Sequence, residues 1–571
     1  MVIVAHGLIR LKLPTTDPIQ VTRMKTKSNL TLLSGQQTTG SRIAISLVSL
    51  SILAFSLTTY PSSAKTSATQ KQGDKTTPAD AAVNTVTEAK LQSALATLEK
   101  MSQQLVTDQS VPGLAVGVVY KDKLVYARGF GVREVGKSEP VDADTVFQLA
   151  SVSKPIASTV VAALVGEGKI NWDSKISELD PQFKMFDPWV TSQITIRDFF
   201  AHRSGLPDHA GDLLEDLGGD RAQVLHSLRY QKPDSSFRSH YEYTNFGITE
   251  GAVAAAKAYG LTWEEASEQK LFRPLGMNSS SARYNDFMAR PNKALGHVKE
   301  NNQWVHRDQR QPDAQSPAGG VSSSVTDMAK WMRLQIDSGK FEGKQIVNEN
   351  ALAETHHPTM LTQFNPFNGT PGFYGLGFNV SYDEHGRLRL NHSGAFGMGA
   401  ATCVTIMPGE QLGVIALTNG SPSGIPEAIN ATFVDIAQNG APQHDWLAIF
   451  KKAFQNPALL GEVKGVDYSK APISVAPQSA SSVYVGKYRN DFFGDLEIKE
   501  TNGKLSMIVG PKNISSPLTH YNRDIFTYMP IGENADGLSG VTFLVGPGEH
   551  ASEIFVEHLN KCGEGTFKLV K

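Results

Sequence analysis

Ser151 and Lys154 are the two residues whose types and spacing most clearly suggest chemistry. They stand three positions apart, just before residues 155–164, where small and branched apolar residues predominate and no charge occurs. Positions i and i+3 share one face of a helix, so both side chains are expected to face the same cleft. A serine hydroxyl needs an adjacent base or cation to act as a nucleophile, and desolvation lets a buried lysine serve as either. The start of the helix adds a positive potential that favours negative charge on Ser151.

Two polar triplets further along the chain could supply partners for Ser151. They are Tyr243-Thr244-Asn245 and His392-Ser393-Gly394. The reference pKa of a phenol, about 10, is too high for a base at neutral pH, so Tyr243 would need a nearby cation, for which Lys154 is the candidate. The amide of Asn245 could orient Lys154 or hydrogen-bond the substrate backbone. Whether Lys154 or Tyr243 is the general base stays open at this level.

These three motifs resemble, in order and rough spacing, those of the serine hydrolases related to class C β-lactamases and DD-peptidases. That group includes esterases and D-aminopeptidases. The resemblance covers roughly residues 90–440. Four other segments add to it: His202–Pro207, Pro274–Met277, Pro317–Ser323 and Tyr374–Phe378.

The resemblance implies that Ser151 attacks a carbonyl carbon and forms an acyl-enzyme, while Lys154 and Tyr243 handle the proton. An oxyanion hole needs two convergent backbone N–H donors. By the resemblance these donors belong to Ser151 and Ala395, the residue after the third motif. The substrate-binding residues that it implies are Asn245, Ser393 and Gly394.

The third motif departs from the β-lactamase pattern, because His392 stands where those enzymes have a lysine. A lysine offers a permanent cation to a substrate carboxylate, whereas histidine is only partly charged near neutral pH. This difference favours the esterase and D-aminopeptidase branches over β-lactam turnover or strict carboxypeptidase activity. His392 is therefore predicted as a fourth catalytic residue, which would share proton transfer with Tyr243 during deacylation.

Composition and missing motifs argue against other chemistries. Charged residues make up 19% of the chain and nearly balance, giving a net charge of −2, so no nucleic-acid footprint is predicted. The sequence has no H-E-x-x-H motif, no cysteine and histidine ligand cluster and no phosphate-binding G-x-x-x-x-G-K-[ST] motif. We therefore expect neither a metal nor a cofactor.

The N-terminal region reads as a secretory signal peptide, residues 1–64. Residues 43–57 form an uncharged run of aliphatic residues, Phe55, alanines and serines that is too short for a comfortable membrane span, and a small-x-small pattern ends at Ala64. The basic residues after Met24 make this methionine a candidate for the true start. A periplasmic or secreted protein is predicted, and membrane anchoring by an uncleaved signal is the alternative.

Residues 65–84 are predicted as a flexible linker and residues 85–455 as the hydrolase domain. Apolar residues at three- and four-residue spacing predict a helix over 86–105. Residues 208–220 and 357–372 are predicted as cleft-wall loops. Strands are predicted over 113–120, 123–129, 378–382, 400–407 and 412–417. Terminal strands, helices and then returning strands indicate an α+β sandwich, an antiparallel sheet flanked by helices beside a helical region, as in the β-lactamase and transpeptidase fold.

A Pro/Ala/Ser-rich stretch, within a linker placed at 456–482, precedes a second domain at 483–571. Seven short alternating strands separated by turns predict a small antiparallel barrel there. It resembles the lipocalin-like domain often appended to these hydrolases. The sequence does not choose among three roles for this domain: capping of the cleft, ligand binding, or self-association into a homo-oligomer.

The functional hypothesis is an exported serine hydrolase that cleaves small amides or esters, with D-amino-acid peptides favoured. One alternative is DD-peptidase, penicillin-binding or β-lactamase activity on peptidoglycan-like substrates. The other is a penicillin- or peptide-binding module that is acylated but barely turns over.

Overall fold

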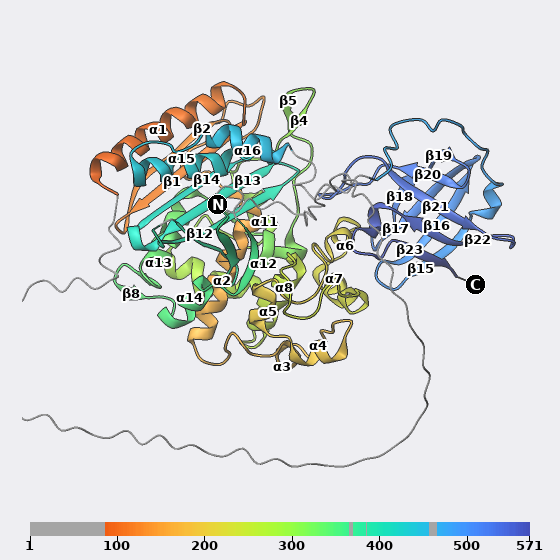
Figure 1. Cartoon of the computed structure of the whole chain (residues 1–571), viewed down its shortest axis with the longest axis horizontal. Helices are drawn as coiled ribbons and strands as arrows, with labels where there is room; N and C mark the ends of the chain where they lie inside the picture. The colour runs from red at the N-terminus through yellow and green to blue at the C-terminus, as the bar shows by residue number, and fades with distance from the viewer. Residues whose placement is uncertain (1–85, 365–368, 384, 456–464, 571) are drawn as a thin grey trace, which may run out of the picture. The chain divides into compact units, whose positions relative to one another are not determined.

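The larger of the two main sheets has eight strands in the order β2-β1-β14-β13-β12-β11-β10-β9, and each neighbouring pair is antiparallel (Figure 1). Its central strands are buried on both faces, which explains their almost continuous apolar sequences. Their bounds are β1 (Gly113–Tyr120), β2 (Lys123–Gly131), β9 (Met360–Phe364), β10 (Pro371–Tyr374), β11 (Asn379–Tyr382), β12 (Leu388–Phe396), β13 (Ala400–Met407) and β14 (Leu412–Thr418).

The computed structural model describes part of the chain, and some predictions lie outside that part. The described residues are 86–364, 369–383, 385–455 and 465–570. The signal peptide and first linker, 1–64 and 65–84, lie outside them, as does part of the second linker. Those assignments stay predictions.

Helices cover both faces of this sheet (Figure 1). On one face, α1 (Glu88–Thr107), α15 (Ile425–Asn439) and α16 (Trp446–Phe454) pack together, and apolar residues of α1 and α15 share a core with β1 and β14. On the other face lies α13 (Val325–Ile336). Thr87 caps α1 by accepting a hydrogen bond from the backbone N–H of Lys90 at 3.3 Å, which fixes the start of the helix predicted over 86–105.

A helical region lies between β2 and β9 in the sequence and contains the two long helices that meet at the candidate site, α2 (Ser153–Gly166) and α8 (Asn245–Lys257). Its shorter helices are α3 (Ile176–Leu179), α4 (Pro188–Gln193), α5 (Ile196–Phe200), α6 (Asp212–Asp216), α7 (Arg221–Ser227), α9 (Trp263–Ser267), α10 (Arg273–Leu275), α11 (Tyr284–Ala289), α12 (Ser316–Gly319) and α14 (Glu349–His356). Three two-stranded ladders complete it: β3 (Phe147–Gln148) with β6 (Ser322–Ser323), β4 (Val298–Glu300) with β5 (Gln303–Val305), and β7 (Lys340–Phe341) with β8 (Lys344–Gln345).

The second main sheet has nine strands, all antiparallel, in the order β18-β17-β16-β15-β23-β22-β21-β20-β19. Only Leu518 separates its two end strands along the chain, so the sheet curls into a nearly closed barrel. Tyr484, Tyr488 and Phe567 are fully buried in its core. The strands are β15 (Gly486–Asn490), β16 (Gly494–Thr501), β17 (Lys504–Val509), β18 (Ile514–Pro517), β19 (Thr519–Asn522), β20 (Ile525–Tyr528), β21 (Ser539–Val545), β22 (Ala551–Val556) and β23 (Thr566–Leu569).

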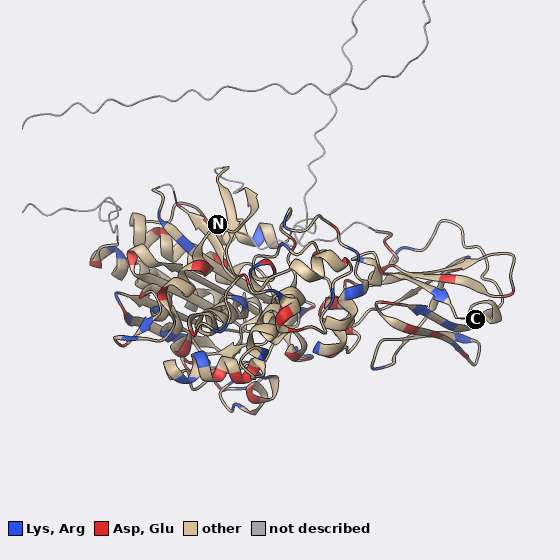
Figure 2. Cartoon of the chain, turned by 90° about the horizontal axis from the view of Figure 1, so that it is seen from below, with Lys and Arg blue, Asp and Glu red and all other residues tan. Residues whose placement is uncertain are grey.

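The structure confirms the predicted fold class, an antiparallel sheet flanked by helices beside a helical region and followed by a small all-β barrel. The prediction of cleft-wall loops was wrong in part, because β9 and β10 arise within or next to 357–372 and α6 lies within 208–220. Acidic and basic residues are interspersed along the chain (Figure 2). In the part of the chain that the structure describes, no helix is long and apolar enough to cross a membrane.

Candidate active site

Ser151 is held at a sharp change of chain direction. The chain leaves β3 and forms a single 3-10 turn, Ala150–Val152, directly before α2 begins. Ala150 has a φ of +46°, a left-handed conformation that non-glycine residues rarely adopt, and its side chain is fully buried. Ser151 therefore stands just ahead of the helix rather than within it.

Lys154 lies in the first turn of α2 and is completely buried. Its Nζ is 3.0 Å from Ser151 Oγ, 2.7 Å from Asn245 Oδ1 and 3.0 Å from the backbone oxygen of Ala318. Burial lowers the pKa of Lys154 well below its ordinary value, although the charge of Asp212 acts in the opposite direction. The predicted pairing of Ser151 with Lys154 is present in the structure.

Tyr243 is the second group on the nucleophile. Its hydroxyl donates a hydrogen bond to Ser151 Oγ at 2.7 Å. Burial raises the pKa of Tyr243 far above that of a free phenol, because the hydrogen bond to Ser151 is outweighed by desolvation and by Asp212 and Asp208. The side chain is thus a neutral phenol. Its ring lies against that of His202, with centroids 4.6 Å apart, and His202 Nδ1 accepts the backbone N–H of Thr244 at 3.1 Å.

Asn245, the first residue of α8, connects Lys154 to a carboxylate that the sequence analysis did not find. Its Oδ1 accepts from Lys154, and its Nδ2 donates to Asp212 Oδ2 at 2.8 Å. The same Asp212 oxygen lies 2.6 Å from His209 Nδ1. Burial opposes protonation of His209, but Asp208 and Asp212 together raise its pKa above the ordinary value. Both ends of the Asn245 amide are engaged, so its geometry supports orientation of Lys154 rather than contact with substrate.

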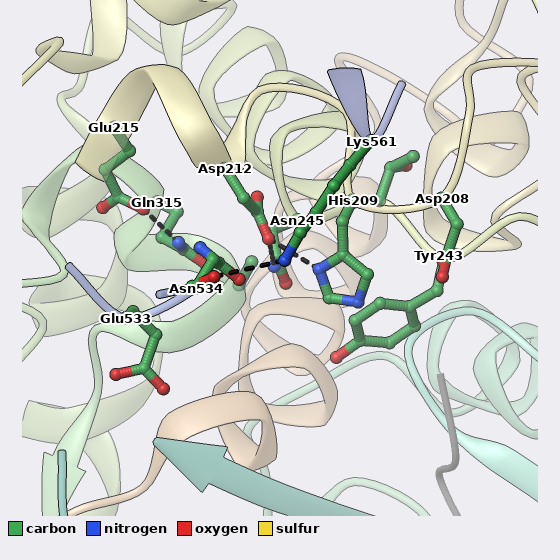
Figure 3. Close-up of polar contacts among 12 residues, drawn as sticks. Asp208, His209, Asp212, Glu215, Tyr243, Asn245, Gln315, Glu533, Asn534 and Lys561 are labelled. Carbon is green, nitrogen blue, oxygen red and sulfur yellow. Dashed lines mark hydrogen bonds and ion pairs between the residues drawn. The ribbon is translucent and has the colours of Figure 1, made fainter. Parts of the chain in front are cut away.

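Figure 3 shows this missed group together with other acidic residues. Asp212 is 4% exposed, and its Oδ1 accepts no hydrogen bond from the residues that the structure describes. Glu215, one helical turn further along α6, pairs with the buried Arg310, and burial raises its pKa to about 7. The signal for His209 and Asp212 was a histidine and a carboxylate three residues apart, directly after the His202–Pro207 segment.

His392 is placed beside Lys154, and its predicted role in proton transfer stays a prediction. Its Nδ1 lies 2.6 Å from the carbonyl oxygen of Ser393, which can only accept, so this nitrogen carries the hydrogen. Its Nε2 then accepts from the Tyr374 hydroxyl at 3.0 Å. Burial, with a further contribution from Lys154, lowers the pKa of His392 to about 3. The ring is neutral at physiological pH, and both nitrogens are occupied within the protein.

Strand β12 brings the third motif against the nucleophile through its backbone. A Cβ built on Gly394 would lie 2.2 Å from the Leu149 oxygen and 2.9 Å from Ser151 N. Because Gly394 approaches Ser151 so closely and Ala395 is the next residue, the two predicted oxyanion donors belong to adjoining segments. The Ser393 side chain points to the other face of the sheet, where it lines a cavity of about 50 Å³ with Cys403 and Glu427. Any contact of Ser393 with substrate must come from its backbone.

Replacing Gly394 by alanine is expected to lower kcat by roughly 100-fold, because the methyl group would overlap the Leu149 oxygen and the Thr402 hydroxyl and push β12 away from Ser151. The overlap should also cost about 1–3 kcal/mol of stability. Steady-state kinetics and thermal unfolding measure both effects. Gly409→Ala is the matched control, because nothing lies within 4 Å of its added Cβ. Equal activity of the two variants would contradict the close approach.

No metal site accompanies these groups among the described residues, where no set of three or more histidine, cysteine, aspartate or glutamate side chains is arranged to hold an ion.

Comparison with known proteins places this geometry in a family. The chain is 26% identical over 326 residues to penicillin-binding protein 4 of Amycolatopsis lactamdurans, covering 55% of this chain and 83% of the relative. It is 23% identical over 404 residues to an unguisins hydrolase of Aspergillus campestris, covering 67% of this chain and 73% of the relative. It is also 26% identical over 257 residues to a beta-lactamase of Escherichia coli, covering 44% and 64%.

A solved structure shares the fold. The octameric penicillin-binding protein homologue from Pyrococcus abyssi aligns with a TM-score of 0.51 at 18% identity, covering 83% of this chain and 99% of that one. The Beta-lactamase family model matches residues 98–439, the part of the chain that holds all three motifs. The chain therefore belongs to the Beta-lactamase family.

Proposed function

We propose that this protein is a serine hydrolase that forms an acyl-enzyme at Ser151 and cleaves small amides or esters, with D-amino-acid peptides favoured. Family membership and the hydrolase and beta-lactamase names of its relatives support the general chemistry. The observation that carries the proposal is that Lys154 Nζ and the Tyr243 hydroxyl converge on Ser151 Oγ at 3.0 and 2.7 Å.

Hydrogen-bond counting supports Lys154 as the general base for acylation. A neutral amine has two N–H groups and one lone pair. The two N–H groups match two acceptors that have no proton to give, Asn245 Oδ1 and the Ala318 carbonyl oxygen. The lone pair is left for the third neighbour, the hydroxyl of Ser151. In this scheme Lys154 takes the proton as Oγ attacks the carbonyl carbon, and burial, which lowers the pKa of Lys154, favours the neutral amine beforehand.

Tyr243 supplies the second proton transfer. As a neutral phenol beside Oγ, it protonates the leaving amine or alkoxide when the tetrahedral intermediate collapses, and the tyrosinate faces the new lysyl ammonium. In deacylation the tyrosinate takes a proton from the attacking water. Lys154 then returns its proton to Ser151 Oγ as the acid product leaves, so every group regains its starting state. The backbone N–H groups of Ser151 and Ala395 stabilise the oxyanion in both steps.

The charges around the site favour substrates with a free amino group over substrates with a free carboxylate. His392 is neutral and cannot provide the cation that a terminal carboxylate would need. Two carboxylates, Asp208 and Asp212, act on Tyr243, and Figure 3 shows them, whereas Glu215 and Glu533 face the guanidinium of Arg310. The negative potential of Asp208 and Asp212 attracts an ammonium group. The preference for D-residues rests on the resemblance to D-aminopeptidases.

Initial rates on matched substrates test this proposal. We expect D-alanyl p-nitroanilide to be cleaved at least about tenfold faster, as kcat/KM, than its N-acetylated form, because acetylation removes the positive charge. L-alanyl p-nitroanilide, a nitrophenyl ester, a D-Ala-D-Ala peptide and a chromogenic cephalosporin complete the panel. Absence of turnover on every compound, with no acyl adduct by mass spectrometry, would refute the proposal.

Peptidoglycan-like substrates are the second candidate, favoured by the penicillin-binding protein names of a relative and of the structural neighbour. Faster cleavage of the D-Ala-D-Ala peptide or of the cephalosporin than of the anilides would select it. A stable adduct with slow release would instead select the binding-module alternative.

A further inference from the structure

A loop of the C-terminal barrel contacts both walls of the candidate site. The barrel and the hydrolase domain belong to one compact unit. The loop, residues 529–538, joins β20 to β21. Figure 3 shows Glu533 and Asn534 from this loop beside residues of the hydrolase domain.

The first contact is with α6. Asp216, the last residue of that helix, accepts the backbone N–H groups of Glu533 and Asn534, each at 3.0 Å, and Asn534 Nδ2 at 2.8 Å. The Asp216 side chain is only 2% exposed, and Arg310 lies 3.5 Å away. A Cβ built on Gly532, whose φ is +99°, would come within 2.5 Å of the Asp216 carboxyl carbon. The loop backbone is therefore fixed tightly to α6.

The second contact is with the turn after the oxyanion strand. The Glu533 carboxylate accepts the backbone N–H of Gly397 through Oε1 and that of Met398 through Oε2 at 3.4 Å. These two residues begin the β12–β13 turn, two and three positions after Ala395. A carboxylate that accepts backbone N–H groups forms charge-assisted hydrogen bonds, which are stronger than neutral ones.

We infer that Glu533 is a positioning residue for the oxyanion hole: anchored on α6 through Asp216, it holds the Gly397–Met398 turn and thereby fixes the Ala395 N–H opposite Ser151. This inference rests on the proposed function, because it assumes that Ala395 serves as an oxyanion donor. It also gives the barrel a role in the reaction, since one residue of the barrel completes the support of the hydrolase site.

The turn needs the support of Glu533 because β12 ends at Phe396 and the chain beyond it is partly exposed, with Gly397 exposed. Without Glu533, the N–H groups of Gly397 and Met398 lose their acceptor. An oxyanion donor must lie within a few tenths of an ångström of its productive position, so small displacements of the turn weaken transition-state binding more than substrate binding.

The test compares Glu533→Ala and Glu533→Gln with Glu549→Ala in the full-length chain. Glu549 is an exposed glutamate in the β21–β22 turn of the same barrel and serves as the matched control. For Glu533→Ala we expect kcat to fall by roughly 10- to 100-fold with KM changed less than about threefold. Glutamine keeps one acceptor oxygen and should give an intermediate loss, while the control keeps full activity.

Inhibition by a boronic acid that forms a tetrahedral adduct with Ser151 distinguishes this role from a purely structural one. If Glu533 only docked the barrel, the inhibition constant would not change in Glu533→Ala. The oxygen of the adduct occupies the oxyanion hole, so the inhibition constant should instead rise by the same factor as kcat falls. An unchanged kcat and inhibition constant in Glu533→Ala, or a change confined to KM, would overturn the inference.

Hydrogen exchange separates a failure of this inference from a failure of the proposed function. The backbone of residues 388–400 should exchange several-fold faster in Glu533→Ala than in the wild type, whatever the substrate. An inactive wild type would refute the proposed function, while unchanged exchange would by itself show that Glu533 does not hold the turn.

Discussion

Replacing Ser151 by alanine is expected to lower kcat by roughly 10⁴-fold or more on every substrate of the wild type and to abolish the acyl adduct. The hydroxyl is the atom on which the amine of Lys154 and the phenol of Tyr243 converge. Without it these two groups have no nucleophile to activate. Steady-state kinetics and intact-protein mass spectrometry after rapid quenching measure the two effects.

Ser393→Ala is the matched control for this experiment, because Ser393 belongs to a motif of the same site but its side chain lies behind the sheet. Its kcat should stay within about threefold of the wild-type value, since the atom removed contacts no reacting group. Residual turnover of Ser151→Ala near the wild-type rate would show that another residue is the nucleophile. An inactive Ser393→Ala protein that is still folded would show that the third motif acts through its serine side chain.

The sequence predicted those features of the site and of the sheets that depend on local spacing and on local apolar patterns. Ser151 and Lys154 are three residues apart, and any helical path brings them together, even though Ser151 itself lies in a 3-10 turn. Three central strands of the hydrolase sheet were predicted because both their faces are buried and their sequences are continuously apolar. Two barrel strands, β18 and β19, were missed because they are short, rich in serine, threonine and other polar residues, and lack a clear apolar alternation.

The sequence could not show contacts that depend on tertiary packing. The surroundings of His392 are an example, because the protonation of its ring depends on complete burial and on Tyr374, which lies on a neighbouring part of the sheet. Asp212 was missed for the same reason: it is an ordinary residue of a short helix until α8 places Asn245 against it. Glu533 lies in another domain, more than 100 residues after the turn that it contacts, and no local pattern links the two.

The charge state of Lys154 can be measured without any substrate, and it decides the mechanism. In the folded protein burial lowers the pKa of Lys154 well below its ordinary value, while in the unfolded chain it is about 10.4. Between these two pKa values the unfolded state binds one more proton than the folded state, so the free energy of unfolding rises with pH. The slope from this group is about 1.4 kcal/mol per pH unit. It vanishes below the lowered pKa and above the unfolded one.

Lys154→Met removes the titrating amine and with it this pH dependence. It should also lower kcat by roughly 10³-fold, because the proton of Ser151 loses its acceptor. Denaturant unfolding at several pH values from 6 upward should show the wild type gaining stability relative to Lys154→Met as pH rises. Lys169→Met, at an exposed lysine, is the control and should show no such difference. The same titration of Lys154 should make kcat/KM of the wild type fall as the pH drops through the lowered pKa, since only the neutral amine accepts the serine proton. Parallel stability curves for wild type and Lys154→Met would mean that Lys154 is charged in the folded protein, and the role of base would pass to Tyr243.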